Sequence, residues 1–195
     1  TPNAIKIFNE KIFAMEFIDL LPPTIISAAS ERIIEFLEIH KEIVIKPLNG
    51  MGGDNIYKVS LEDQPSLEKV KILTQNSKIQ IIGQKFLPKI VEGDFRILVI
   101  DGKPFEYCLA RIPKDGSFLG NLAKGGTGIA KKITPNQKEI AEIVGARLKS
   151  ENILFAGIDI IDDKLTEINI TSPTCAVEIY NQTGENPVAR IFESL

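Results

Sequence analysis

Two short polar turns, each between two apolar runs, constrain the fold of this chain more than any other feature. They are Asp101-Gly102 and Asp162-Asp163, and the runs that they join are 96–100 with 104–112 and 155–161 with 164–170. Such dipeptides are typical of tight turns between antiparallel strands. Apolar residues at helical spacing occur between these hairpins, for example within 134–150. The sequence therefore predicts an α+β fold with a mostly antiparallel sheet.

Composition narrows the class of protein. With 195 residues, 44% of them hydrophobic, the chain can bury a core in one or two closely packed units. A net charge of -3 gives no overall attraction to nucleic acid or to anionic membranes, and no apolar run approaches the roughly 20 residues that span a bilayer. Cys108 and Cys175 lie far apart and without metal-ligand spacing. We therefore expect a cytoplasmic protein with neither a nucleic-acid partner nor a membrane partner.

The order of the expected elements suggests a division near residue 80. We expect a smaller unit at 1–80, which contains a glycine-rich turn, and a larger one at 81–195, which contains both hairpins. Between the hairpins, the segment 113–128 is rich in glycine and has no apolar period. Long segments of this kind inside compact domains are usually functional lids or are disordered.

The second hairpin places oxygen-bearing side chains on one face. Glu167 and Asn169 alternate with Ile168 and Ile170, so they project to the same side of the strand. If the connection is Asp162 to Lys164, Asp159 lies opposite Glu167 on that side. Magnesium prefers such hard oxygen ligands, although an isolated pattern of this kind is more often a solvated hairpin face.

The segment Lys46-Pro-Leu-Asn-Gly-Met-Gly-Gly53 places a lysine at the end of a strand and three glycines in the turn after it. Glycines allow backbone N–H groups to approach a polyphosphate closely, and lysine adds a positive charge. The order of residues is not that of a Walker A loop, and a plain glycine turn with a surface lysine is the alternative.

Two arginines flank the first hairpin. A two-residue turn at Asp101-Gly102 would place Arg96 opposite Tyr107 and leave Arg111 beyond the paired end of the strand. Guanidinium groups there would suit the charge that develops on a transferring phosphoryl group. Ordinary surface arginines are the alternative interpretation.

Several motifs in order resemble the bacterial glutathione synthetases, which are ATP-grasp ligases. The resemblance runs from Asn9 to about Cys175. The motifs are Asn9-Glu-Lys11, Lys46-Pro-Leu-Asn-Gly-Met-Gly-Gly53, Gln84-Lys-Phe-Leu-Pro88, Gly93-Asp-Phe-Arg96, Tyr107-Cys-Leu-Ala-Arg-Ile-Pro113, Gly120-Asn-Leu-Ala-Lys-Gly-Gly126 and Thr166-Glu-Ile-Asn-Ile-Thr-Ser-Pro-Thr174.

The resemblance implies roles for particular residues, with ATP held between two α+β subdomains. The residues expected at ATP are Lys11, Lys46, Gly50, Gly52, Gly53, Gln84, Phe86, Leu87 and Asp94. Arg96 and Arg111 would act on the transferred phosphate and the dipeptide carboxylate, and Asp159, Glu167 and Asn169 would hold Mg2+ or Mn2+. The expected substrate residues are Asn121, Gly125, Gly126, Ser172 and Thr174, with 113–128 as a mobile lid.

The implied reaction joins γ-glutamylcysteine to glycine with ATP as co-substrate, through an acyl phosphate. Family members carry another α/β domain ahead of the part that matches Asn9, so we expect a domain fragment, or a chain completed by another polypeptide. With that domain present we expect a homo-oligomer. Two alternatives stay open: an ATP-grasp ligase for another acid and amine, and an inactive module that only binds Mg-ATP.

Overall fold

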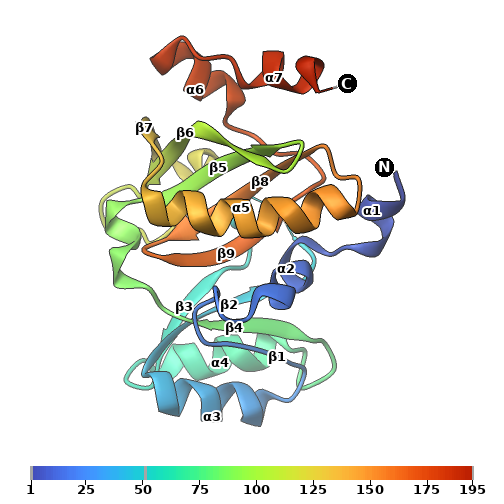
Figure 1. Cartoon of the computed structure of the whole chain (residues 1–195). Coiled ribbons are helices and arrows are strands. Elements are labelled where there is room, and N and C mark those ends of the chain that lie inside the picture. Colours follow the sequence, from blue (N-terminus) through green and yellow to red (C-terminus); the bar gives the residue numbers. More distant parts are fainter. Residues whose placement is uncertain (1, 51, 195) are drawn as a thin grey trace. The chain divides into compact units, whose positions relative to one another are not determined.

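The computed structural model describes residues 2–50 and 52–194, which form two units (Figure 1). The smaller unit is Pro22–Pro88, and the larger one combines the segment that ends at Leu21 with the segment that begins at Lys89. This division differs from the expected one near residue 80. The N-terminal segment belongs to the larger unit because Phe13, Ala14 and Leu21 are buried in that unit's core.

The smaller unit is a four-stranded antiparallel sheet with two helices. Its strand order is β1-β4-β2-β3, with β1 at Thr24–Ser27, β2 at Glu42–Pro47, β3 at Tyr57–Ser60 and β4 at Ile81–Lys85. Helices α3 (Ser30–His40) and α4 (Gln64–Leu73) complete it. Ile43 and Ile45 of β2 are fully buried with Ile33 and Leu37 of α3, so alternation turns Lys46 to the opposite face of the sheet.

The larger unit is built on a five-stranded antiparallel sheet in the order β7-β6-β5-β8-β9. The strands are β5 (Asp94–Ile100), β6 (Lys103–Ile112), β7 (Thr127–Lys132), β8 (Phe155–Ile161) and β9 (Lys164–Asn169), and short 3-10 turns lie at Pro88–Glu92 (η2) and Leu122–Lys124 (η3). Both hairpins and the α+β class predicted from the sequence are confirmed.

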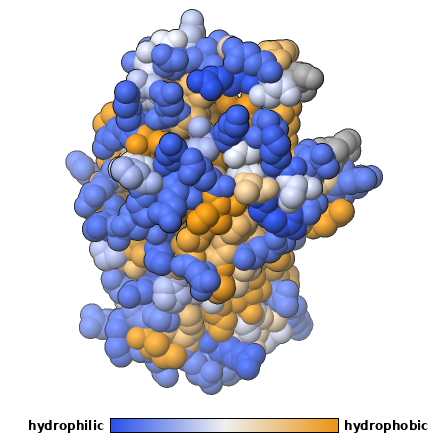
Figure 2. All heavy atoms as spheres, viewed as in Figure 1, coloured by the Kyte–Doolittle hydropathy of each residue, from blue (hydrophilic) through white to orange (hydrophobic). Residues whose placement is uncertain are grey.

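Helices cover both faces of this sheet. On one face, helix α5 (Pro135–Ser150) buries Val144 and Leu148 against Ile97 and Ile158. The short elements α1 (Pro2–Ile7), α2 (Glu10–Phe13) and η1 (Ala14–Phe17) contribute to the same core. On the other face, α6 (Ala176–Thr183) packs on part of the sheet and is followed by α7 (Pro187–Glu193). Figure 2 shows mostly hydrophilic residues where α5 meets solvent.

The first hairpin has a different register from the predicted one. Its turn pairs Ile100 with Lys103 as expected. The register then shifts, because Val99 pairs with Pro104 but Ile97 pairs with Cys108, so that three residues of β6 lie opposite one residue of β5. Arg96 therefore lies opposite Leu109 rather than Tyr107, and Arg111 lies opposite Asp94 inside the strand. Pro104, which has no N–H to donate, stands where the irregularity begins.

The glycine-rich segment is shorter than the predicted 113–128. Strand β7 begins at Thr127 and pairs along β6 as an edge strand. An edge strand needs few apolar residues, and most of its side chains are exposed, which is why the missing apolar period hid it. No helix within 2–50 and 52–194 is long and apolar enough to cross a membrane.

The predicted start of α5 is confirmed and allows a stability test. The Thr134 hydroxyl accepts the Gln137 N–H at 3.2 Å, and the Gln137 side chain accepts the Thr134 N–H at 3.0 Å. We expect Thr134→Ala to lower the free energy of unfolding by about 1 kcal/mol, because it removes one half of this capping box. Urea denaturation measures the change. Thr134→Ser is the control, and an equal loss in both variants would contradict the capping role.

Candidate active site

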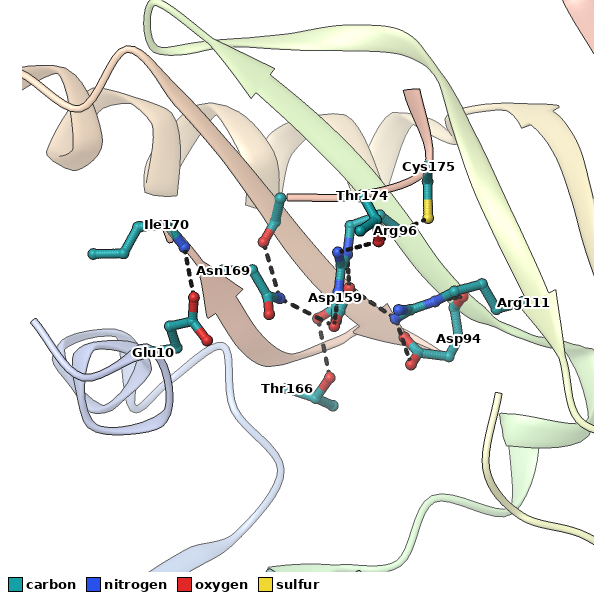
Figure 3. A network of polar contacts seen from close by, with 11 residues as sticks. Glu10, Asp94, Arg96, Arg111, Asp159, Thr166, Asn169, Ile170, Thr174 and Cys175 are labelled. Atoms are coloured by element: carbon teal, nitrogen blue, oxygen red, sulfur yellow. Dashed lines mark hydrogen bonds and ion pairs between the residues drawn. The ribbon is translucent and has the colours of Figure 1, made fainter. Parts of the chain in front are cut away.

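A row of charged side chains crosses the sheet of the larger unit. Arg96 of β5 lies opposite Asp159 of β8, and Asp159 lies opposite Glu167 of β9. Residues in one cross-strand row project to the same face. Figure 3 shows that Arg96 and Asp159 of this row belong to a polar network that also contains Arg111 and Asp94.

Asp159 is the centre of the network. Its Oδ1 accepts hydrogen bonds from Arg96 Nε and lies 2.9 Å from Arg111 Nη2, and its Oδ2 accepts from Arg96 Nη2 at 2.8 Å. The residue is only 3% exposed. Burial alone would raise the pKa of Asp159, but the charges of Arg111 and Arg96 outweigh it and hold the pKa below its ordinary value. Asp159 is therefore an anion that the two arginines hold in place.

Asp94 also contacts Arg111, but its pKa is shifted in the direction opposite to that of Asp159. Its Oδ2 accepts from Arg111 Nη2 at 2.6 Å, whereas its Oδ1 is buried and has no hydrogen-bond partner among the described residues. Burial raises the pKa of Asp94 to about 6, although the charge of Arg111 opposes the shift. The site thus holds one permanently ionised carboxylate beside one that can take up a proton near neutral pH.

The three oxygen-bearing residues predicted for the second hairpin, Asp159, Glu167 and Asn169, lie next to one another. Asp159 lies opposite Glu167, and Asn169 Nδ2 donates to Asp159 Oδ2 at 3.2 Å. The route differs from the prediction, since the turn has two residues and a bulge at Thr166 restores the pairing. The Thr166 hydroxyl donates to the Asp159 carbonyl at 3.2 Å and so fixes this bulge. Lys11 Nζ lies 3.2 Å from Glu167 Oε1.

Gly157 makes room for Arg96. A Cβ atom at this position would lie 2.8 Å from Arg96 Cδ and 3.3 Å from Pro173 Cβ. The Arg96 side chain passes over residue 157 beside Asp159, and a side chain at 157 would force it to shift. Sequence reasoning missed this residue, and the sequence contains no local signal for it, since the requirement comes from the neighbouring strand.

The predicted lid residues lie next to the network. The backbone at Gly120 passes so close to Arg111 that a Cβ atom would lie 2.5 Å from the Arg111 carbonyl oxygen. The Asn121 carbonyl accepts the N–H of Gly126 at 3.3 Å, and Gly125 has the left-handed φ of 89°. Asn121, Gly125 and Gly126 thus form one tight turn. Thr174 is exposed and accepts from Arg96 Nη1 at 3.5 Å, whereas Ser172 is exposed farther along the same segment.

The smaller unit presents the other predicted nucleotide residues. Lys46 and Gln84 are 8% and 4% exposed, and their positions on β2 and β4 place them on the sheet face that α3 does not cover. The ammonium group of Lys58 lies 4.0 Å from the centre of the Phe86 ring, and Leu87 follows half-buried. Gly52 and Gly53 have φ values of 68° and 83°, which favour glycine. Gly50 precedes them, and Met51 lies outside the described residues.

Four residues of these surroundings were not predicted: Glu10, Lys58, Gly157 and Thr166. Glu10 had a usable signal, because it stands beside Lys11 within a motif that the resemblance includes. The Lys58 and Thr166 contacts depend on strand pairing and on a bulge, which the sequence does not reveal.

Solved structures identify the fold. A D-cycloserine synthetase matches 95% of this chain and 68% of its own, with a TM-score of 0.74 and 16% identity. An ATP-grasp ligase from Chryseobacterium gregarium that is described as RiPP-associated matches the whole chain and 61% of its own, with a TM-score of 0.73 and 18% identity. The chain therefore has the ATP-grasp fold.

Sequence comparisons identify the family. The family model described as "Prokaryotic glutathione synthetase, ATP-grasp domain" matches residues 10–184, and the chain belongs to this family. It is 47% identical over 179 residues to a glutathione synthetase of Pseudomonas aeruginosa and 43% identical over 195 residues to one of Nitrosomonas europaea. The matches cover 91% and 100% of this chain but 56% and 61% of those relatives. The predicted family and fold are confirmed.

Gly157→Ala tests the close approach of Arg96. We expect a loss of about 1–3 kcal/mol in the free energy of unfolding, because the new methyl group forces Arg96 to shift within a tightly packed site. Denaturant unfolding of Gly157→Ala, Arg96→Ala and the double variant forms a mutant cycle. In the Arg96→Ala background, Gly157→Ala should lower the free energy of unfolding much less than it does in the unaltered protein. An equal cost in both backgrounds would show that another neighbour is responsible.

Asp94 offers a pH test. Its carboxyl group should titrate near pH 6, which the 13C chemical shift of the side chain reports directly. Because the folded state holds this proton after the unfolded chain has lost it, Asp94 should make the fold less stable as the pH rises from about 4 to 6. Asp94→Asn should remove that part of the pH dependence. Ionisation of Asp94 below pH 5 would refute the prediction.

Proposed function

We propose that this chain is the ATP-grasp part of a glutathione synthase, which joins γ-glutamylcysteine to glycine. The observation that carries the proposal is the family match at 10–184, because this range contains the whole Arg96–Asp159–Glu167 row together with Lys11, Lys46 and Arg111. A fold match alone would leave the chemistry open, since many reactions share one fold.

The proposed reaction has two steps. A carboxylate is a poor electrophile, so ATP first transfers its γ-phosphoryl group to the cysteinyl carboxylate, with ADP as the leaving group. The glycine amine then attacks the carbonyl carbon of this acyl phosphate, the bond from carbon to the phosphate oxygen breaks, and phosphate and a proton leave. Such transfers depend mainly on positioning and on neutralising charge.

Arg96 and Arg111 are the proposed catalytic groups. Both are about 95% buried, and both hold their charge, since burial opposes their ionisation but Asp159 outweighs it and raises the pKa of each. A guanidinium group in a site with little water stabilises phosphoryl and carboxylate oxygens strongly. We infer that these two side chains bind the transferred phosphoryl group and the dipeptide carboxylate.

The residues that we assign to ATP come from both units. We assign Lys11 and Lys46 with the glycines 50, 52 and 53 to the phosphates, and Gln84, Phe86 and Leu87 to the adenine. Asp94 is assigned to the neighbourhood of the nucleotide. Support comes from Lys46 and Gln84, which share one face of their sheet, and from Gly52 and Gly53, whose positive φ values form a tight loop.

Asp159, Glu167 and Asn169 are the proposed ligands of Mg2+ or Mn2+. The donor set fits, because it offers two carboxylates and one amide within one patch of the sheet. Among the described residues no group of three or more His, Cys, Asp or Glu side chains could hold a metal ion by itself. Phosphates and water would supply the remaining ligands, as is usual for Mg2+. When bound, the ions would offset phosphate charge. Because both carboxylates already contact cationic side chains, we expect metal to bind together with the nucleotide.

The substrate residues are assigned by their place around the network. Ser172 and Thr174 would bind substrate carboxylates, and the turn of Asn121, Gly125 and Gly126 belongs to a lid that excludes water from the acyl phosphate. We also propose a cytoplasmic location, and a homo-oligomer when the additional N-terminal domain of the family is present. The second candidate is a ligase for another acid and amine, since solved structures with this fold include a D-cycloserine synthetase.

A paired substitution tests the metal and reaction assignment. Glu167→Gln keeps the shape of the side chain and should lower ADP release with γ-glutamylcysteine and glycine by at least about 100-fold, because it removes a charged ligand. Glu16→Gln is the control, since Glu16 makes an ion pair with Arg147 at the surface of the same unit. ADP release is measured in the longest form of the protein that its gene encodes.

The outcomes separate the candidates. Turnover with another acid and amine, and none with γ-glutamylcysteine, would favour the second candidate. Full turnover of Glu167→Gln would refute the ligand assignment. Asp159→Asn is a weaker test, because it removes the carboxylate that pairs with buried Arg96 and one of the two that pair with buried Arg111, and so disturbs the fold as well.

A further inference from the structure

Glu10 has a distinctive position and no role in the proposed reaction. It begins α2, directly before Lys11. Its Oε1 accepts the backbone N–H of Ile170 at 3.2 Å and that of Thr171 at 3.1 Å. Figure 3 shows the first of these bonds at the edge of the polar network. One carboxylate oxygen thus holds two successive peptide groups that lie directly after β9.

These two peptide groups lie where the strand ends. β9 is the last strand of its sheet, and its pairing with β8 ends at Asn169 opposite Gly157. Beyond that point a different partner must hold the backbone. Hydrogen bonds to an ionised group are stronger than those between neutral groups. Glu10 therefore fixes the point at which the chain leaves the sheet.

Helix α2 is itself firmly held, so it can serve as an anchor. The Asn9 side chain accepts the N–H groups of Lys11 and Ile12 at 3.0 and 3.1 Å. Phe13 is 2% exposed and stacks on Phe8 with ring centres 4.3 Å apart. Lys11 contacts Glu167. Glu10 thus binds the backbone after Asn169, and its neighbour Lys11 binds the Glu167 side chain before Asn169.

The segment that Glu10 anchors returns to the arginines. Its far end carries Thr174, which accepts from Arg96 Nη1 at 3.5 Å. Pro173 lies near the place where Arg96 crosses Gly157. The segment 170–174 is therefore held at Glu10 on one side and contacts Arg96 on the other, and the exposed Ser172 lies between these points.

We propose that Glu10 is a positioning residue that fixes segment 170–174 and thereby the site for the acid substrate. The substrate part of this inference rests on the proposed function, whereas the ordering of the segment does not. Glu10 touches neither reacting group. It acts through the backbone that presents Ser172 and Thr174.

The test compares Glu10→Ala, Glu10→Gln and the control Glu16→Ala in the full chain. Glu16 is an acidic neighbour from the same N-terminal segment, and its partner Arg147 is at the surface. Calorimetry measures the affinities for ATP with Mg2+ and for γ-glutamylcysteine in the presence of a non-hydrolysable ATP analogue. Backbone 15N relaxation measures the order of Ser172, Thr174 and Cys175.

We expect Glu10→Ala to weaken γ-glutamylcysteine binding about tenfold, as for the loss of hydrogen bonds to a charged group, and to change ATP affinity less than about twofold. Order at 172, 174 and 175 should fall. Glu10→Gln keeps an acceptor oxygen and should restore most of the γ-glutamylcysteine affinity and most of the backbone order. Glu16→Ala should change neither the affinity nor the order. Equal weakening of both ligands, or no rescue by glutamine, would overturn the inference.

The two proposals can fail separately. If the unaltered protein does not bind γ-glutamylcysteine, the proposed substrate is wrong, and the relaxation data then decide the role of Glu10. Order at 172, 174 and 175 that is unchanged in Glu10→Ala would overturn the positioning role whatever the substrate is.

Discussion

The structure of the larger unit depends on one buried carboxylate held by two arginines. Asp159 stays ionised with 3% exposure only because Arg96 and Arg111 contact it from β5 and β6. Removing one partner from such a group leaves an uncompensated charge in a place that water hardly reaches. Three other features support Asp159. Gly157 leaves space for the Arg96 side chain, the Thr166 hydroxyl at the bulge donates to the Asp159 carbonyl, and the Asn169 amide donates to the Asp159 carboxylate. The side chains to which we assign the catalytic chemistry are therefore also ones on which the fold depends.

Much of this arrangement could be predicted from local sequence. Turn dipeptides located both hairpins, and alternation placed Glu167 and Asn169 on one face. The registers were harder, because an irregularity such as the one between Ile97 and Val99 leaves no clear local trace. For that reason Arg111 was expected beyond the paired end of its strand, although it pairs with Asp94. Contacts such as that of Glu10 depend on residues at the other end of the chain, and a single sequence does not reveal such pairs.

The two sheets carry different parts of the proposed site. The smaller unit presents Lys46 and Gln84, which sit on strands of a conventional sheet with helices on its other face. The larger unit presents the charged network, and the apolar residues around Cys175 and Ile179 cover part of the same sheet face. These apolar neighbours exclude water from one side of the arginines, so the strength of the charges comes partly from residues with no polar group at all.

The path of the chain has a consequence for biosynthesis. Because the smaller unit occupies Pro22–Pro88, all of its strands have been translated before any strand of the larger one. The segment with Glu10 and Lys11 is translated before the smaller unit, yet Thr171, whose backbone N–H donates to Glu10, lies 161 residues after it. Helix α2 must therefore wait until β9 has been translated before it can contact that strand. A ribosome that stalls before β9 would release a chain with all strands of the smaller unit but without Glu167 and Asn169, which complete the polar network around Asp159.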